Sequence, residues 1–234
     1  AWSRLSIARS VTVFAVASRD YFPAAPAGAE LIHTRNYEVR TYKLSPDKFL
    51  LRGVVCDEKP AGLYIPEDPE PLWVHHMVVD LEITFPMFEI VSVHVEFKER
   101  PHTHCTDIEP DYQKLVGLSI ARGFNNKVKE LFGGPRGCTH IGALLAAMAP
   151  VAIQSGWSMR VGAAMGTQDA PNTSTEEQRK RSYAMNLNTC HIWDENGDMV
   201  RGIEQGVPME VPLWISKRFK ELGREDSDWD KFRG

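Results

Sequence analysis

The sequence predicts an α+β protein in which an antiparallel sheet packs against a helical segment of about residues 111–154. Three observations favour this class. Strand-like runs follow one another between residues 37 and 97, and helical patterns come after them instead of alternating with them. A late pair of short strands, a hairpin, is expected after residue 183. A chain of 234 residues is long enough to bury a substantial core.

Four strands are expected in the first half of the chain, arranged as a meander. In the third strand, alternation places His75 on one face together with Trp73 and the apolar residues that follow, and it places His76 on the other face. Residues 59–71, which precede that strand, are expected to form a loop, because no helix or interior strand tolerates so many prolines. The expected strands are Tyr37–Leu44, Phe49–Cys56, Trp73–Phe85 and Phe88–Phe97.

Helices are expected after the strands. One ends at Gly133-Gly134-Pro135, a typical stop signal, and another begins near Asn172–Thr175, ahead of Glu176. The predicted helices are Asp111–Val116, Asn125–Phe132, Cys138–Gln154 and Pro212–Leu222. The late hairpin would pair Tyr183–Trp193 with Met199–Ile203 around a turn at residues 194–197.

Residues 31–223 are expected to form a single domain, between a poorly predicted segment, residues 1–30, and a charged tail, residues 224–234. Residues 4–17 have the outline of a signal peptide, and a plain buried segment fits them as well. The four cysteines are widely scattered, which favours reduced thiols over disulfides. We therefore expect a cytoplasmic protein, with export left open.

Composition excludes several classes of partner. The net charge of −4 argues against a general binder of nucleic acid or anionic membranes. No uninterrupted apolar run approaches about 18 residues, so no membrane-spanning helix is expected. The sequence contains no glycine-rich nucleotide motif. The expected partner is a small-molecule substrate, and homo-oligomerisation is left open.

The stretch Gly133–His140, which runs into a predicted helix, is the best candidate for chemistry. The N–H groups at a helix start favour an anion, so Cys138 would exist partly as a thiolate, and His140 would position or deprotonate it. A bland alternative remains, in which the glycines only end one helix and begin the next and Cys138 is a small core residue. Similarly, His102 and His104 are either a metal-binding pair or exposed side chains.

Together with several other stretches, the segment Gly133–His140 resembles the uncharacterised bacterial family catalogued as domain of unknown function 2889. The most specific stretch is Gly137-Cys138-Thr139-His140-Ile141. The resemblance runs from about Arg35 to Arg201. Two departures are His76, where the family usually has an acidic residue, and Gly142–Ala146, which lacks the usual Thr-Glu. The other matching stretches are Leu51–Pro60, His75–Met77, Cys105 with Leu115–Gly117, and Thr189–His191 with Asn196-Gly197. The resemblance implies catabolism of a hydrophobic, aromatic or phenolic small molecule.

Two classes of function remain. The first is an enzyme with His75, Cys138 and His140 as catalytic residues, most simply a cofactor-independent lyase or hydrolase working by acid–base chemistry. A zinc-dependent version would use Cys105, Cys138, His140 and Cys190 as ligands. In either version Trp73, Thr139 and Arg136 are expected to contact the substrate. The second class is a non-catalytic module that binds a small molecule or a structural metal.

Overall fold

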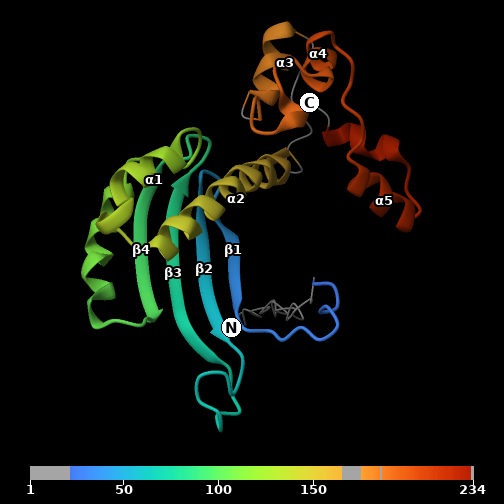
Figure 1. Ribbon diagram of the computed structural model, residues 1–234. Helices are drawn as coiled ribbons and strands as arrows, with labels where there is room; N and C mark the ends of the chain where they lie inside the picture. The colour runs from blue at the N-terminus through green and yellow to red at the C-terminus, as the bar shows by residue number, and fades with distance from the viewer. Residues whose placement is uncertain (1–21, 165–174, 185, 233–234) are drawn as a thin grey trace, which may run out of the picture.

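Four long strands follow one another along the chain and pair in the same order, which confirms the predicted meander (Figure 1). The computed structural model describes residues 22–164, 175–184 and 186–232, so the segment 4–17 considered for export lies outside the described residues. All three strand pairs are antiparallel. The strands are β1 (Thr34–Ser45), β2 (Lys48–Lys59), β3 (Leu72–Thr84) and β4 (Ile90–Glu99).

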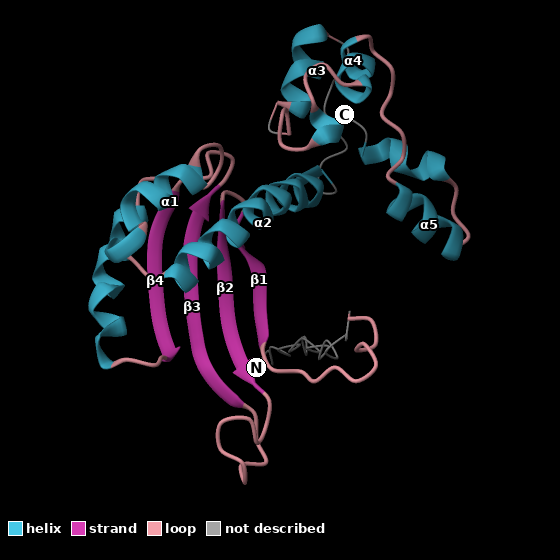
Figure 2. Cartoon of the chain, viewed as in Figure 1, coloured by secondary structure: helices cyan, strands magenta, loops and turns pink. Residues whose placement is uncertain are grey.

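One face of the sheet is covered by the long helix α2 (Thr139–Ala164), which crosses the strands obliquely (Figures 1 and 2). Alternate residues of the strands point to this face and are buried there, as the period of two requires. The helix α2 approaches the sheet closely at Gly53 of β2, where a Cβ atom would lie 2.5 Å from Sδ of Met148. The core is built mainly from Phe49, Leu51, Val55, Met77, Val79, Leu81 and Ile83 of the sheet and Ile141, Leu144, Leu145 and Met148 of α2.

The segment between β4 and α2 packs beside β4 and closes the core. It contains the 3₁₀ helix η1 (Thr103–Leu115), the helix α1 (Phe124–Phe132) and the short η2 (Gly134–Arg136). The ring of Tyr112 packs on Phe132 with 4.7 Å between centroids, and both residues are buried. The helix predicted at residues 125–132 is confirmed, and the one predicted at 111–116 is the end of the longer η1.

After residue 175 the structure is helical, so the predicted hairpin is wrong. The sequence pattern predicts a strand for Val200 and Ile203. Because they are three residues apart, both lie on one face of the helix α4, where they are buried with Tyr183. The five residues of Met199–Ile203 are too few to distinguish the period of two of a strand from the period of about 3.6 of a helix. The capping box at Thr175 is present, as the helix-start signal predicts. The elements are α3 (Glu176–Tyr183), η3 (His191–Trp193), α4 (Asp198–Glu204), α5 (Leu213–Glu221) and η4 (Asp226–Phe232), the last of which lies in the predicted charged tail.

Among the described residues, one helix is long and apolar enough to cross a membrane. It is Thr139–Arg160 of α2, with a mean hydropathy of 1.3; polar residues interrupt its apolar run, which is why the sequence predicts no such helix. Core helices of soluble proteins reach the same length and composition. In this fold Ile141, Leu144 and Leu145 of α2 are fully buried in the core that the helix shares with the sheet.

Candidate functional site

Three polar side chains form a row at one end of the covered face of the sheet. Arg35 of β1 lies directly opposite Asp57 of β2, which in turn lies opposite His75 of β3. Directly opposed residues on neighbouring strands point to the same face. Asp57 is 1% exposed and is the one buried charged residue in the part of the chain that the structure describes. The sheet therefore carries a buried carboxylate at one end of a face whose other buried residues, in the described chain, are apolar.

Arg35 neutralises this carboxylate through a two-pronged ion pair. Its Nε lies 2.5 Å from Oδ1 of Asp57, and its Nη2 lies 2.5 Å from Oδ2. The hydrogen bonds from the guanidinium lower the pKa of Asp57 to about 2, against the opposing effect of burial. His33, just before β1, places Nε2 3.4 Å from Oδ1. Asp57 is therefore ionised at neutral pH and acts only as an acceptor.

His75 is fixed by the same carboxylate. Its Nδ1 lies 2.9 Å from Oδ2 of Asp57. Since the ionised carboxylate only accepts, Nδ1 of His75 carries the proton and donates it. In the neutral ring, Nε2 then holds the lone pair. The side chain of His75 is 20% exposed, so the ring is accessible from solvent.

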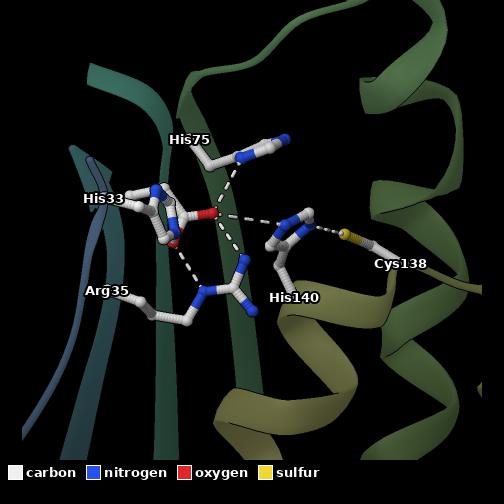
Figure 3. Close-up of polar contacts among 6 residues, drawn as sticks. His33, Arg35, His75, Cys138 and His140 are labelled. Carbon is white, nitrogen blue, oxygen red and sulfur yellow. Dashed lines mark hydrogen bonds and ion pairs between the residues drawn. The ribbon is translucent and has the colours of Figure 1, made fainter. Parts of the chain in front are cut away.

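His140 reaches the row from the first turn of α2 (Figure 3). Its Nε2 lies 3.5 Å from Oδ2 of Asp57, and its ring stacks on that of His75 with 3.9 Å between centroids. On the other side, Nδ1 of His140 lies 3.5 Å from Sγ of Cys138. Burial, and to a lesser degree the nearby His75 and Arg35, lower the pKa of His140 despite the opposing charge of Asp57. His140 is therefore neutral at neutral pH.

Cys138 is held at the start of α2 by its backbone. Its N–H donates to the hydroxyl of Tyr112 at 2.9 Å, and its carbonyl accepts the N–H of Gly142 at 2.9 Å. Tyr112 is fully buried, which raises its pKa to about 12, so its hydroxyl stays protonated. Gly137 is extended, and a Cβ atom on it would lie 2.5 Å from the carbonyl oxygen of Phe132. The turn before Cys138 thus requires glycine.

In chemical terms, the site contains a thiol, a neutral imidazole and an ionised carboxylate, each next to the following one in space. A nucleophile beside a base that a third group orients is the arrangement of catalytic triads. Here the order is Cys138, His140 and Asp57, with hydrogen-bonding or ion-pair distances between successive members.

The model of the DUF2889 family, described as protein of unknown function, matches residues 33–154. The chain belongs to this family. No curated protein and no solved structure matches it. The DUF2889 match contains the whole site, from His33 to His140, together with the sheet and the first part of α2. The resemblance traced from the sequence runs on to Arg201, whereas the family match ends before Thr189–His191.

Within the DUF2889 region, the structure brings together the residues predicted to be catalytic. His75 and His140 stack, and Cys138 lies beside His140. Sequence reasoning missed Asp57 and Arg35. A signal for Asp57 was present, because it continues the odd-numbered series of Leu51 and Val55, which are buried on the covered face. A carboxylate in phase with core residues needs a partner.

The four predicted metal ligands do not form one cluster in the described chain, although Cys138 and His140 lie 3.5 Å apart. Cys105, in η1, is half-buried and packs against the core, and Cys190 is exposed just before η3. The cluster of potential ligands in the described chain is Asp57, His75 and His140, whose ligand atoms lie within 4.8 Å of one another.

Of the loop histidines, His104 pairs with Asp107 at 2.9 Å on the exposed surface of η1. His102 precedes this helix.

Of the residues expected to contact substrate, Thr139 and Arg136 are exposed at the start of α2 and in η2. Trp73 does not share a face with His75, so the prediction that alternation places the two on one face is wrong. The register of β3 shifts between His75 and Trp73, and this bulge turns Trp73 toward His76 and Glu58. Trp73 lines a separate open cavity of about 600 Å³ together with Glu58, Glu70, Pro71, Leu72 and Glu99.

Proposed function

We propose that this chain is a cofactor-independent hydrolase in which Cys138 is the nucleophile, His140 the general base and Asp57 the residue that orients the base. The observation that carries the proposal is the placement of His140, with Nδ1 3.5 Å from the thiol and Nε2 3.5 Å from the carboxylate. Looser contacts of this kind are common in catalytic sites before substrate binds.

The protonation states fit this role. Ionised Asp57 favours the proton of neutral His140 on Nε2, which leaves the lone pair on Nδ1 facing the thiol. On attack, the proton of Cys138 passes to Nδ1 of His140 as Sγ bonds to a carbonyl carbon. The imidazolium is stabilised by Asp57. It then protonates the leaving group as the bond between the carbonyl carbon and the leaving group breaks. Water hydrolyses the resulting thioester.

The start of α2 supports the same chemistry. The first N–H groups of a helix have no carbonyl partner four residues earlier, and the positive end of the helix dipole lies there. The α2 helix begins at Thr139, directly after the nucleophile, so these groups are available to an oxyanion formed at Cys138. This feature favours a hydrolase over a lyase, which needs no oxyanion site beside a thiol.

His75 has a supporting place in the proposal. Its Nδ1 contacts the carboxylate of Asp57, its ring stacks on that of His140, and its side chain is 20% exposed. We assign Nε2 of His75 as the base that takes a proton from water in the second step. As substrate we propose a small hydrophobic molecule, in particular an aromatic ester or thioester, handled in the cytoplasm.

The decisive experiment changes Cys138 and measures both hydrolysis and thiol reactivity. Cys138→Ser should reduce turnover of aryl ester and thioester substrates by at least about 100-fold, since a thiol nucleophile has no substitute in the site. Cys190→Ser, at an exposed cysteine outside the family region, is the matched control and should retain full activity. Alkylation by iodoacetamide, read by mass spectrometry, should label Cys138 fastest in the wild type and more slowly in His140→Ala. Full activity of Cys138→Ser would refute the proposal.

A further inference from the structure

The ligand atoms of Asp57, His75 and His140 lie close enough together to hold a metal ion. Oδ2 of Asp57 lies 2.9 Å from Nδ1 of His75 and 3.5 Å from Nε2 of His140, and all three atoms lie within 4.8 Å of one another. A tetrahedral zinc ion with bonds of about 2.0–2.2 Å places its ligand atoms roughly 3.3–3.6 Å apart, so the contact between Asp57 and His75 has to lengthen slightly. The cluster thus reaches coordination geometry with small side-chain movements.

We propose that Asp57, His75 and His140 form a Zn²⁺ site, and that zinc bound there reversibly inhibits the enzyme by occupying its base. The site differs from the cysteine-based ligand set that the sequence indicates. The inhibitory part rests on the proposed function, whereas the binding part stands without it.

The donor set favours a first-row transition metal, of which Zn²⁺ is the one proposed here. Two imidazoles and one carboxylate suit Zn²⁺, whereas Mg²⁺ and Ca²⁺ require a shell of oxygen ligands. Arg35 acts from outside this set, because its guanidinium orients both oxygens of Asp57 and also reduces the charge that the carboxylate offers to a cation. Binding is therefore weaker than in a structural zinc site, as reversible inhibition requires.

The inhibition follows from the two nitrogens of His140. Zinc takes the lone pair of Nε2, so the single proton of the neutral ring must lie on Nδ1. A protonated Nδ1 donates toward Sγ of Cys138 and no longer accepts its proton. In His75 the exchange is the opposite one: zinc takes the lone pair of Nδ1, so the single proton of the neutral ring lies on Nε2. Cys138 lies on the Nδ1 side of His140 and is not a ligand.

The test measures zinc binding directly, by isothermal titration with Zn²⁺ alone and by elemental analysis after dialysis. We expect one zinc ion per wild-type chain, binding at least about tenfold weaker in His75→Ala, and wild-type binding in Cys138→Ser. His75→Gln serves as a second ligand variant, with circular dichroism to verify folding. Co²⁺ in place of zinc should give d–d bands without a thiolate charge-transfer band.

Inhibition is read from alkylation of Cys138, which needs no substrate. Zinc should slow labelling in the wild type at least about tenfold and leave the rate in His75→Ala unchanged. The zinc site is refuted by absence of stoichiometric binding, or by binding that is lost in Cys138→Ser and retained in His75→Ala. Zinc binding without any effect on labelling refutes the inhibition. Loss of hydrolysis in Cys138→Ser, measured separately, tests the proposed function whatever the zinc result.

Discussion

Asp57 organises the site because it is a buried charge with several partners. A carboxylate removed from water is costly unless ion pairs and hydrogen bonds replace its hydration. In this fold Arg35, His33, His75 and His140 surround its two oxygens. The side chains that stabilise the charge are thus also those that a catalytic or metal-binding role requires, and loss of any one of them affects stability and chemistry together.

Arg35 should make the stability of the protein depend on acid pH. The pKa of Asp57 falls from 3.8 to about 2 on folding, so the ion pair contributes roughly 2 kcal/mol above pH 4. Because the folded pKa is the lower one, this contribution is complete above the unfolded pKa and is lost as the pH falls toward 2. Arg35→Gln should lower the free energy of urea unfolding by about that amount at neutral pH and flatten its acid dependence.

The matched control for Arg35 is Arg52, which makes the same two-pronged contact with Asp80, at 2.7 and 2.5 Å, on the exposed face of the sheet. Exposed ion pairs contribute little, so Arg52→Gln should change stability by less than about 1 kcal/mol. Equal losses in the two variants would show that burial of Asp57 does not strengthen its ion pair.

His140 should set the acid limit of the reaction. Only the neutral ring accepts the proton of Cys138, and burial lowers the pKa of His140 below its ordinary value of 6.5. The rate constant for alkylation of Cys138, followed against pH, should therefore rise through an acid limb that lies below pH 6.5. In Asp57→Asn the charge that opposes this shift is gone, and the limb should move to still lower pH. A limb above 6.5 in the wild type would contradict the assignment.

The sheet and α2 were predictable because their patterns are long, whereas the parts that were missed depend on single residues. The strands show period two over ten or more residues, and α2 is apolar over several turns. The bulge before His75, which turns Trp73 away, leaves no mark in an alternating run. The chemical pair Cys138 and His140 was visible as a motif, but their carboxylate partner lies 81 residues earlier and meets them only through packing of α2 on the sheet.

The turn that leads into α2 should be sensitive to one methyl group. A Cβ atom at Gly137 would meet the backbone of Phe132, which cannot move without displacing α1 or α2. Gly137→Ala should cost roughly 1–3 kcal/mol of unfolding free energy and displace Cys138 from His140. Gly142→Ala, one turn into α2, meets nothing within 4 Å and should stabilise the helix by up to about 1 kcal/mol. Thermal and urea unfolding of both variants, with labelling of Cys138, checks this.

Two hydrophobic clusters are present in the described chain, and the elements that carry the site, β1, β2, β3 and α2, belong to the part of the chain around the larger one. The larger cluster joins the sheet, η1, α1 and α2, and the smaller joins Tyr183 of α3 with Val200 and Ile203 of α4. The DUF2889 match, residues 33–154, contains every member of the larger cluster except Met159. Arg122 links the two parts by donating to the carbonyls of Ala184 and Leu187, at 3.3 and 3.0 Å.

These clusters should respond separately to core mutations, which tests the prediction of a single domain over residues 31–223. Ile203→Ala removes buried apolar area from the small cluster and should cost it about 2 kcal/mol or more. Because Ile203 belongs to the small cluster and is not a member of the larger one, amide exchange measured by mass spectrometry should increase in α3 and α4 and stay unchanged in β2 and β3. Leu145→Ala, at a fully buried position of α2, is the converse and should increase exchange in the strands. If Ile203→Ala also increases exchange in β2 and β3, the two clusters unfold as one cooperative unit and the single-domain prediction holds.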